Sequence, residues 1–133
     1  MNNNKSIIEA GVLGKQHRLL REAAKPFEQL LVSGTPAPVM LLALKKLRYL
    51  SVAHERAEHE ALRSGPDQVL LEDLHKDIGL LWSDFMNGME QVLDSSSAVV
   101  GEDLVRSGKK LTAGLHEHWR LEEETFIDQY ALS

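Results

Sequence analysis

Residues 45–60 read KKLRYLSVAHERAEHE, and residues 109–124 read KKLTAGLHEHWRLEEE. When His54 is aligned with His118, the two segments also match at a Lys-Lys-Leu triplet, an arginine and two glutamates. In each segment a glutamate follows the histidine four residues later. An internal repeat indicates how a fold is built, and these repeated positions also carry groups that bind metal ions.

The paired residues are His54 with Glu58 and His118 with Glu122. On a helix, side chains four residues apart share one face, with Cβ atoms about 6 Å apart. Imidazole and carboxylate groups that converge in this way suit a metal ion. Both pairs share their face with leucine, so the two carboxylates are predicted to point inward, where an uncompensated charge is costly. Arg21 is the one basic residue expected near them, and a pair of metal cations would supply the missing charge.

Two further histidines, His17 and His75, lie in a second repeat. When one is aligned with the other, five apolar positions of the first copy fall on apolar positions of the second: Leu13, Leu20, Ala24, Phe27 and Leu31 on Leu71, Ile78, Trp82, Phe85 and Met89. Their spacing of three or four residues is typical of an amphipathic helix. The chain is therefore predicted to form two helical hairpins, each with a lone histidine followed by a histidine–glutamate pair.

Four helices are expected, at about 10–32, 39–63, 67–93 and from 101 or 102 to 130, with residues 1–9 disordered or capping. Pro26 is expected to kink or break the first helix. No stretch alternates with a period of two for long enough to predict a strand. Helices of this length with short connectors predict an all-α fold, an antiparallel up-down-up-down four-helix bundle that forms one domain over residues 1–133.

The composition limits the classes of function. A net charge of −5 and a pI near 5.6 argue against nucleic acid or an anionic membrane as partners. The absence of cysteine removes disulfides, thiolate metal sites and cysteine nucleophiles. No signal peptide and no apolar run long enough to cross a membrane is found, so a cytoplasmic protein is expected. The oligomeric state is not predicted.

The remaining histidines, His59 and His116, lack the features of the predicted ligands. By helical phase they lie about 140° from His54 and about 160° from His118. Arginine, not an acid, follows each of them four residues later. Both are predicted to face solvent.

Other bundle metal sites fit less well. Ferritin-like di-iron proteins need two Glu-x-x-His pairs, and only Glu72 with His75 forms one here. A closed zinc site is not expected, because six ligands exceed one tetrahedral shell and cysteine is absent.

With these six residues in this order, the chain resembles the hemerythrin-like (HHE cation-binding) family over nearly its whole length. The resemblance implies a four-helix bundle around two non-haem iron ions, bridged by carboxylates and by an oxo or hydroxo group. The first two histidines would ligate one iron, the last two the other, and both glutamates would bridge. The implied metal ligands are His17, His54, Glu58, His75, His118 and Glu122.

Two departures from the oxygen-carrying members matter. Those proteins have another histidine four residues after the ligand of the third helix, where this chain has Gly79. They also place the last acid five residues after its histidine, and here both Glu122 and Glu123 are available. Glu122 is preferred because it matches Glu58 in the repeat. A missing histidine leaves more positions open, which resembles the branch linked to nitric oxide, peroxide or iron-centre repair.

The expected function is binding of O2, NO or peroxide at the di-iron centre, for oxygen or redox sensing, storage or detoxification. Leucine, isoleucine and Trp82 are expected to keep the pocket dry. The sequence does not decide whether the protein is an enzyme. The side activity expected of such a centre is oxidase- or peroxidase-like. The alternative is a metal-free signalling or interaction bundle, for which the DLHKDIG segment around His75 resembles a phosphotransfer site.

Overall fold

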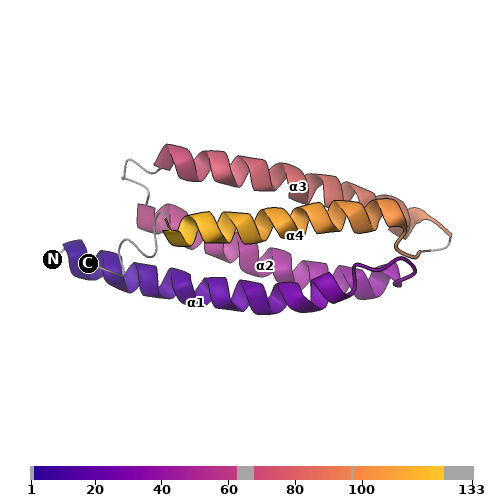
Figure 1. Ribbon diagram of the computed structural model, residues 1–133, viewed down its shortest axis with the longest axis horizontal. Coiled ribbons are helices and arrows are strands. Elements are labelled where there is room, and N and C mark those ends of the chain that lie inside the picture. Colours follow the sequence, from indigo (N-terminus) through magenta and orange to yellow (C-terminus); the bar gives the residue numbers. More distant parts are fainter. Residues whose placement is uncertain (1, 63–67, 97, 125–133) are drawn as a thin grey trace.

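The computed structural model describes residues 2–62, 68–96 and 98–124. These residues form four helices: α1 (Asn2–Gln29), α2 (Ala37–Leu62), α3 (Gln68–Asp94) and α4 (Glu102–Glu122). Successive helices run in opposite directions, and α1 packs mainly on α2 while α3 packs mainly on α4 (Figure 1). The predicted antiparallel four-helix bundle is confirmed. Within the described ranges, no helix is both long enough and apolar enough to span a membrane.

The predicted helix boundaries hold within a few residues, except at the two ends of the chain. The prediction of disorder or capping was wrong for residues 2–9, which are helical, because neither proline nor glycine interrupts the chain before Gly11. α1 also runs through Pro26 and ends at Gln29. The proline removes one backbone donor close to the end of the helix, where little helix remains to be broken. The predicted continuation of the last helix from 125 to 130 lies outside the described residues.

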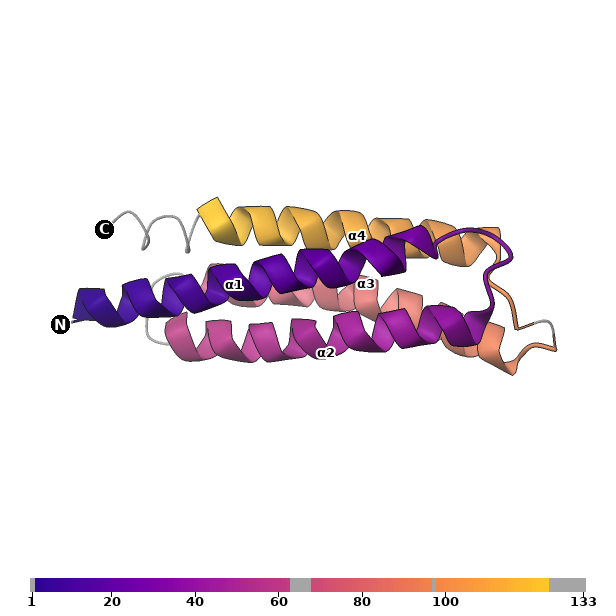
Figure 2. The same cartoon turned by 90° about the horizontal axis from the view of Figure 1, so that it is seen from below.

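The two loops at one end of the bundle are joined to each other (Figure 2). An isolated antiparallel bridge pairs Pro36 with Val99, and the backbone N–H of Ala37 donates to the carbonyl of Ala98 at 2.8 Å. Gly34, with φ of 96°, provides the left-handed turn that this loop needs. The first hairpin is thus tied to the second at the end where the α1–α2 and α3–α4 connections lie.

An apolar core fills the half of the bundle nearest these loops. The rings of Phe27 and Phe85, which are equivalent in the repeat, meet edge to face with centroids 5.3 Å apart. Gly108 lets α4 approach closely, because a Cβ there would lie 2.3 Å from a methyl of Leu31. Further members of the core are also almost fully buried, among them Met40, Leu44, Met89, Val100 and Leu104. The inward positions predicted from the repeat are therefore confirmed where the structure describes their side chains. Leu71 is the exception, because its side chain is outside the described part of the structure.

Candidate metal centre

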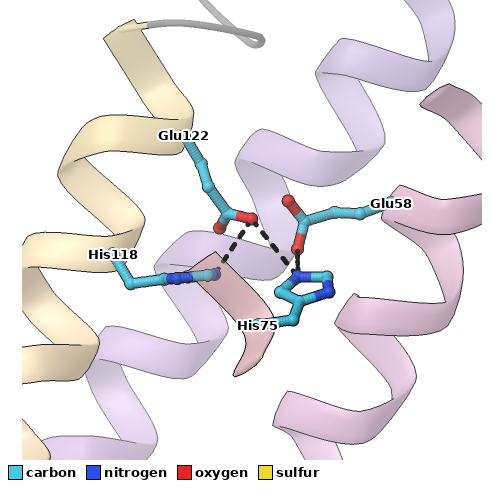
Figure 3. Close-up of side chains that lie close together, drawn as sticks. All are labelled: Glu58, His75, His118 and Glu122. Carbon is cyan, nitrogen blue, oxygen red and sulfur yellow. Dashed lines mark hydrogen bonds and ion pairs between the residues drawn. The ribbon is translucent and has the colours of Figure 1, made fainter. Parts of the chain in front are cut away.

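All six predicted ligands come together in the other half of the bundle. Their donor atoms form two groups, and within each group all donor atoms lie within 4.8 Å of one another. The first group comprises His17, His54 and Glu122. The second comprises Glu58, His75, His118 and again Glu122. Five of the six side chains are buried, and the side chain of His75 is 11% exposed. Figure 3 shows the second group, with side chains from α2, α3 and α4 converging on one point.

The helical period accounts for the two histidine–glutamate pairs. His54 Nε2 lies 3.0 Å from Glu58 Oε1 within α2, and His118 Nε2 lies 3.1 Å from Glu122 Oε2 within α4. Each contact joins residues four apart, as predicted from the sequence.

Glu122 stands between the two groups and is fully buried. Its Oε1 lies 3.1 Å from His17 Nε2 and 3.5 Å from His54 Nε2. Its Oε2 lies 3.1 Å from His118 Nε2 and 3.8 Å from His75 Nε2 (Figure 3). Despite these distances, Oε2 makes no hydrogen bond within the described part of the chain. One carboxylate thus presents one oxygen to each pair of histidines.

Glu58 occupies a similar position on the opposite helix. Its Oε1 lies 3.0 Å from His54 Nε2 and 3.4 Å from His75 Nε2, so it also reaches one histidine of each pair. Burial alone would raise the pKa of this carboxyl, but its interactions with His54 and His75 outweigh that effect and hold the pKa at about 2. Glu58 is therefore ionised at neutral pH although it is almost fully buried.

The rings of His17 and His54 are held from behind by polar side chains. His17 Nδ1 lies 3.1 Å from an oxygen of Glu123, which also pairs with Arg21. His54 Nδ1 lies 2.7 Å from Oε1 of Gln16. Both partners are acceptors, so each Nδ1 carries the proton and donates it. Outer hydrogen bonds of this kind fix the tautomer and orient the ring of a ligating histidine.

The protons on Nδ1 leave two lone pairs facing each other. His17 Nε2 lies only 2.8 Å from His54 Nε2. Burial, together with the neighbouring His54, lowers the pKa of His17 to about 4, so its ring is neutral at pH 7. A positive charge, either a proton or a metal ion, must relieve the repulsion. Two nitrogens bound at right angles to one ion would be about 3 Å apart, so the spacing fits two ligands of a single ion.

The pKa of His118, on the other side of the centre, is also lowered. Burial, despite the attraction of Glu58, lowers the pKa of His118 to about 4. Its ring stacks on that of His75 with centroids 5.3 Å apart. Metal ions bind the neutral form of imidazole, so both rings whose pKa is lowered are in the binding form at pH 7.

His59 was predicted to face solvent, and this was wrong. It is half-buried, and its Nε2 lies 3.2 Å from His75 Nδ1. Helical phase separates His59 from His54 on α2, but it does not reveal that the ring of His75 reaches α2 from the neighbouring helix. His59 is thus an outer contact of a predicted ligand. His116 is exposed, as predicted, and bonds Glu28 at 2.6 Å.

The aromatic lining also differs from the prediction. A small cavity beside His54 and His118 is lined by Trp119 and not by Trp82. Trp82 lies instead under Arg48, whose guanidinium carbon is 4.9 Å from the ring centroid. Sequence analysis missed Trp119, although it lies four residues after Leu115 on the apolar face of α4.

Comparison with known proteins gives no match. No family profile fits the sequence, no curated protein is significantly similar to it, and no solved structure matches the fold. The function is therefore argued from the geometry of the site.

Proposed function

We propose that the protein binds two iron ions that share Glu122 and Glu58. The first ion would be held by His17 and His54, and the second by His75 and His118. The observation that carries this proposal is the division of the Glu122 carboxylate, whose two oxygens lie at 3.1 Å from histidines of different pairs. A carboxylate that bridges two metal ions needs this arrangement.

The charges of the site fit the same proposal. Buried carboxylates need a counter-charge, and Arg21, the nearby cation predicted from the sequence, is paired with Glu123. Four imidazoles and two carboxylates are ligands that suit iron, and oxygen ligands lower the preference for soft metals. Iron would supply redox chemistry and coordination sites for small ligands. The ligand set and its order are those that resemble the hemerythrin-like family.

We further propose that the centre binds a diatomic molecule or peroxide, for sensing, storage or detoxification in the cytoplasm. Gly79 supports open coordination positions, because it offers no donor one turn after His75 and a Cβ there would meet nothing within 4 Å. The cavity beside His54 and His118 is about 10 Å³ in volume, which suits a small molecule.

No observation favours the phosphotransfer alternative. His75 lies 3.4 Å from Glu58 and 3.8 Å from Glu122, with 11% of its side chain exposed. A phosphoryl group would be repelled by these two carboxylates. A phosphotransfer histidine also needs an accessible ring.

The test is reconstitution of the untagged protein with ferrous iron in the absence of oxygen. After desalting, we expect two iron atoms per chain and a change in near-ultraviolet absorption when O2, NO or peroxide is added. The His116→Ala variant, altered at the exposed histidine, is the matched control and should retain the same iron. Retention of zinc but not iron in a parallel reconstitution with zinc would change the metal assignment, and retention of neither metal would contradict the proposal.

A further inference from the structure

Besides the predicted ligands, two polar residues line the cavity beside the centre, Ser51 and Glu55. The cavity has a volume of about 10 Å³, roughly the space that one water molecule needs. The side chains around it are two predicted ligands, four large apolar residues, one glutamate and one serine: His54, His118, Leu20, Ile78, Leu115, Trp119, Glu55 and Ser51. A molecule of one or two heavy atoms beside the ligands would therefore contact Ser51.

Ser51 is buried, and no hydrogen bond to a described residue gives its hydroxyl a structural role. The residue is 4% exposed, and within the described part of the chain its hydroxyl oxygen has no hydrogen-bond partner. A helical serine can usually bond a carbonyl of the preceding turn, and an unsatisfied buried hydroxyl costs stability. Thr112 on α4 shows the usual solution, because its buried hydroxyl donates to the carbonyl of Lys109 at 3.1 Å.

We infer that the Ser51 hydroxyl donates a hydrogen bond to a small ligand bound at the centre on the His54 side. The inference rests on the proposed function. Ser51 lies three residues before His54 on α2, so both residues approach the cavity from one face. The aliphatic residues around the cavity offer no donor, Trp119 carries only its indole N–H, and the histidine nitrogens at the centre face the carboxylates. The ligand class is a molecule of one or two heavy atoms that carries an acceptor atom, such as NO or O2.

The test compares Ser51→Ala with Thr112→Val, which also removes a buried hydroxyl but does not line the cavity. Both variants should hold as much iron as the unmodified protein. The probe is nitric oxide added to the reduced, iron-loaded protein. Ser51→Ala should weaken its binding about five- to tenfold, which corresponds to one hydrogen bond, while Thr112→Val should not.

A second readout follows the hydrogen bond itself. In the unmodified protein, the N–O stretching frequency should shift between H2O and D2O, because the serine proton exchanges; in Ser51→Ala this sensitivity should be lost. The metal-free Ser51→Ala protein should melt at the same or a higher temperature, since the hydroxyl has no partner there.

The outcomes separate the two proposals. Unchanged nitric oxide affinity and unchanged isotope sensitivity in Ser51→Ala would overturn the role of Ser51 and leave the di-iron proposal standing. Loss of iron from Ser51→Ala, or an equal loss of affinity in Thr112→Val, would also overturn it, because either would mean a general packing effect. An unmodified protein that holds no iron would end the proposed function, and this inference with it.

Discussion

The two halves of the bundle are built on opposite principles. In the half near the paired loops, Phe27, Phe85 and Met40 are fully buried and belong to the apolar core. In the other half, five of the six predicted ligands are buried, with ring nitrogens and carboxylate oxygens about 3 Å apart. Burial of apolar surface stabilises the first half without help, whereas burial of charge without a partner destabilises the second. The fold is thus held by one half, while the other half keeps a costly arrangement that a bound cation would stabilise.

The largest expected effect belongs to the apolar half. Phe85→Ala removes a ring that packs against Phe27 and should lower the free energy of unfolding by about 3–5 kcal/mol. The loss should be the same in the metal-free and iron-loaded proteins, as measured by denaturant unfolding. A loss of iron from the folded variant would show that the two halves are coupled more closely than the packing indicates.

Glu122→Gln should separate metal binding from stability. The amide keeps the volume of the side chain but removes the charge that both pairs of histidines share, so iron affinity should fall at least about 100-fold. In the metal-free protein the same change should leave stability unchanged or raise it, because it removes a fully buried charge. Iron titration and thermal melts of one preparation measure both quantities. Retention of two tightly bound iron atoms would refute the shared role of Glu122.

Acid should destabilise the metal-free protein through the ligand half. The pKa of His17 and that of His118 are lowered from 6.5 to about 4 by burial. Between these values the unfolded chain binds protons that the folded chain does not, so stability is full above pH 6.5 and is lost as the pH falls towards 4. Melting temperatures across this range should drop by several degrees. His118→Leu should reduce the dependence, and an unchanged slope would mean that other groups cause it.

The smallest effect concerns the outer contact that the sequence did not predict. His59→Ala removes the ring 3.2 Å from His75 Nδ1 and should weaken binding of one of the two irons about tenfold. His116→Ala should leave the affinity for both irons unchanged, because His116 contacts Glu28 at the surface. Competition with a chelator measures both affinities. Equal behaviour of the two variants would make His59 another surface histidine.

The sequence predicted those parts of the site that depend on a single helix. The spacing of His54 and Glu58, and the inward phase of Phe27 and Phe85, follow from the helical period and are found in the structure. Contacts between helices were not predictable in this way, because they depend on how far a ring reaches across the bundle. His59 was misplaced for this reason, whereas Trp119 was missed although its spacing from Leu115 on α4 would have revealed it.

The choice between Glu122 and Glu123 shows the same limit. Both are close enough to His118 in the sequence to serve the site, and the repeat favoured Glu122. In the structure Glu122 lies among the Nε2 atoms, while Glu123 accepts from Nδ1 of His17 at 3.1 Å. Glu122 therefore faces the centre, whereas Glu123 bonds the nitrogen of His17 that points away from it. The widening of α4 into a π-type turn at residues 123–124 accompanies this arrangement.

The central claim is that two metal ions share Glu122 between two pairs of histidines, and anomalous diffraction at the iron edge tests it most directly. Crystals of iron-loaded protein should show two peaks roughly 3.5–4 Å apart, one beside His17 and His54 and the other beside His75 and His118. A single peak, or none at this position in protein that retains iron, would contradict the account.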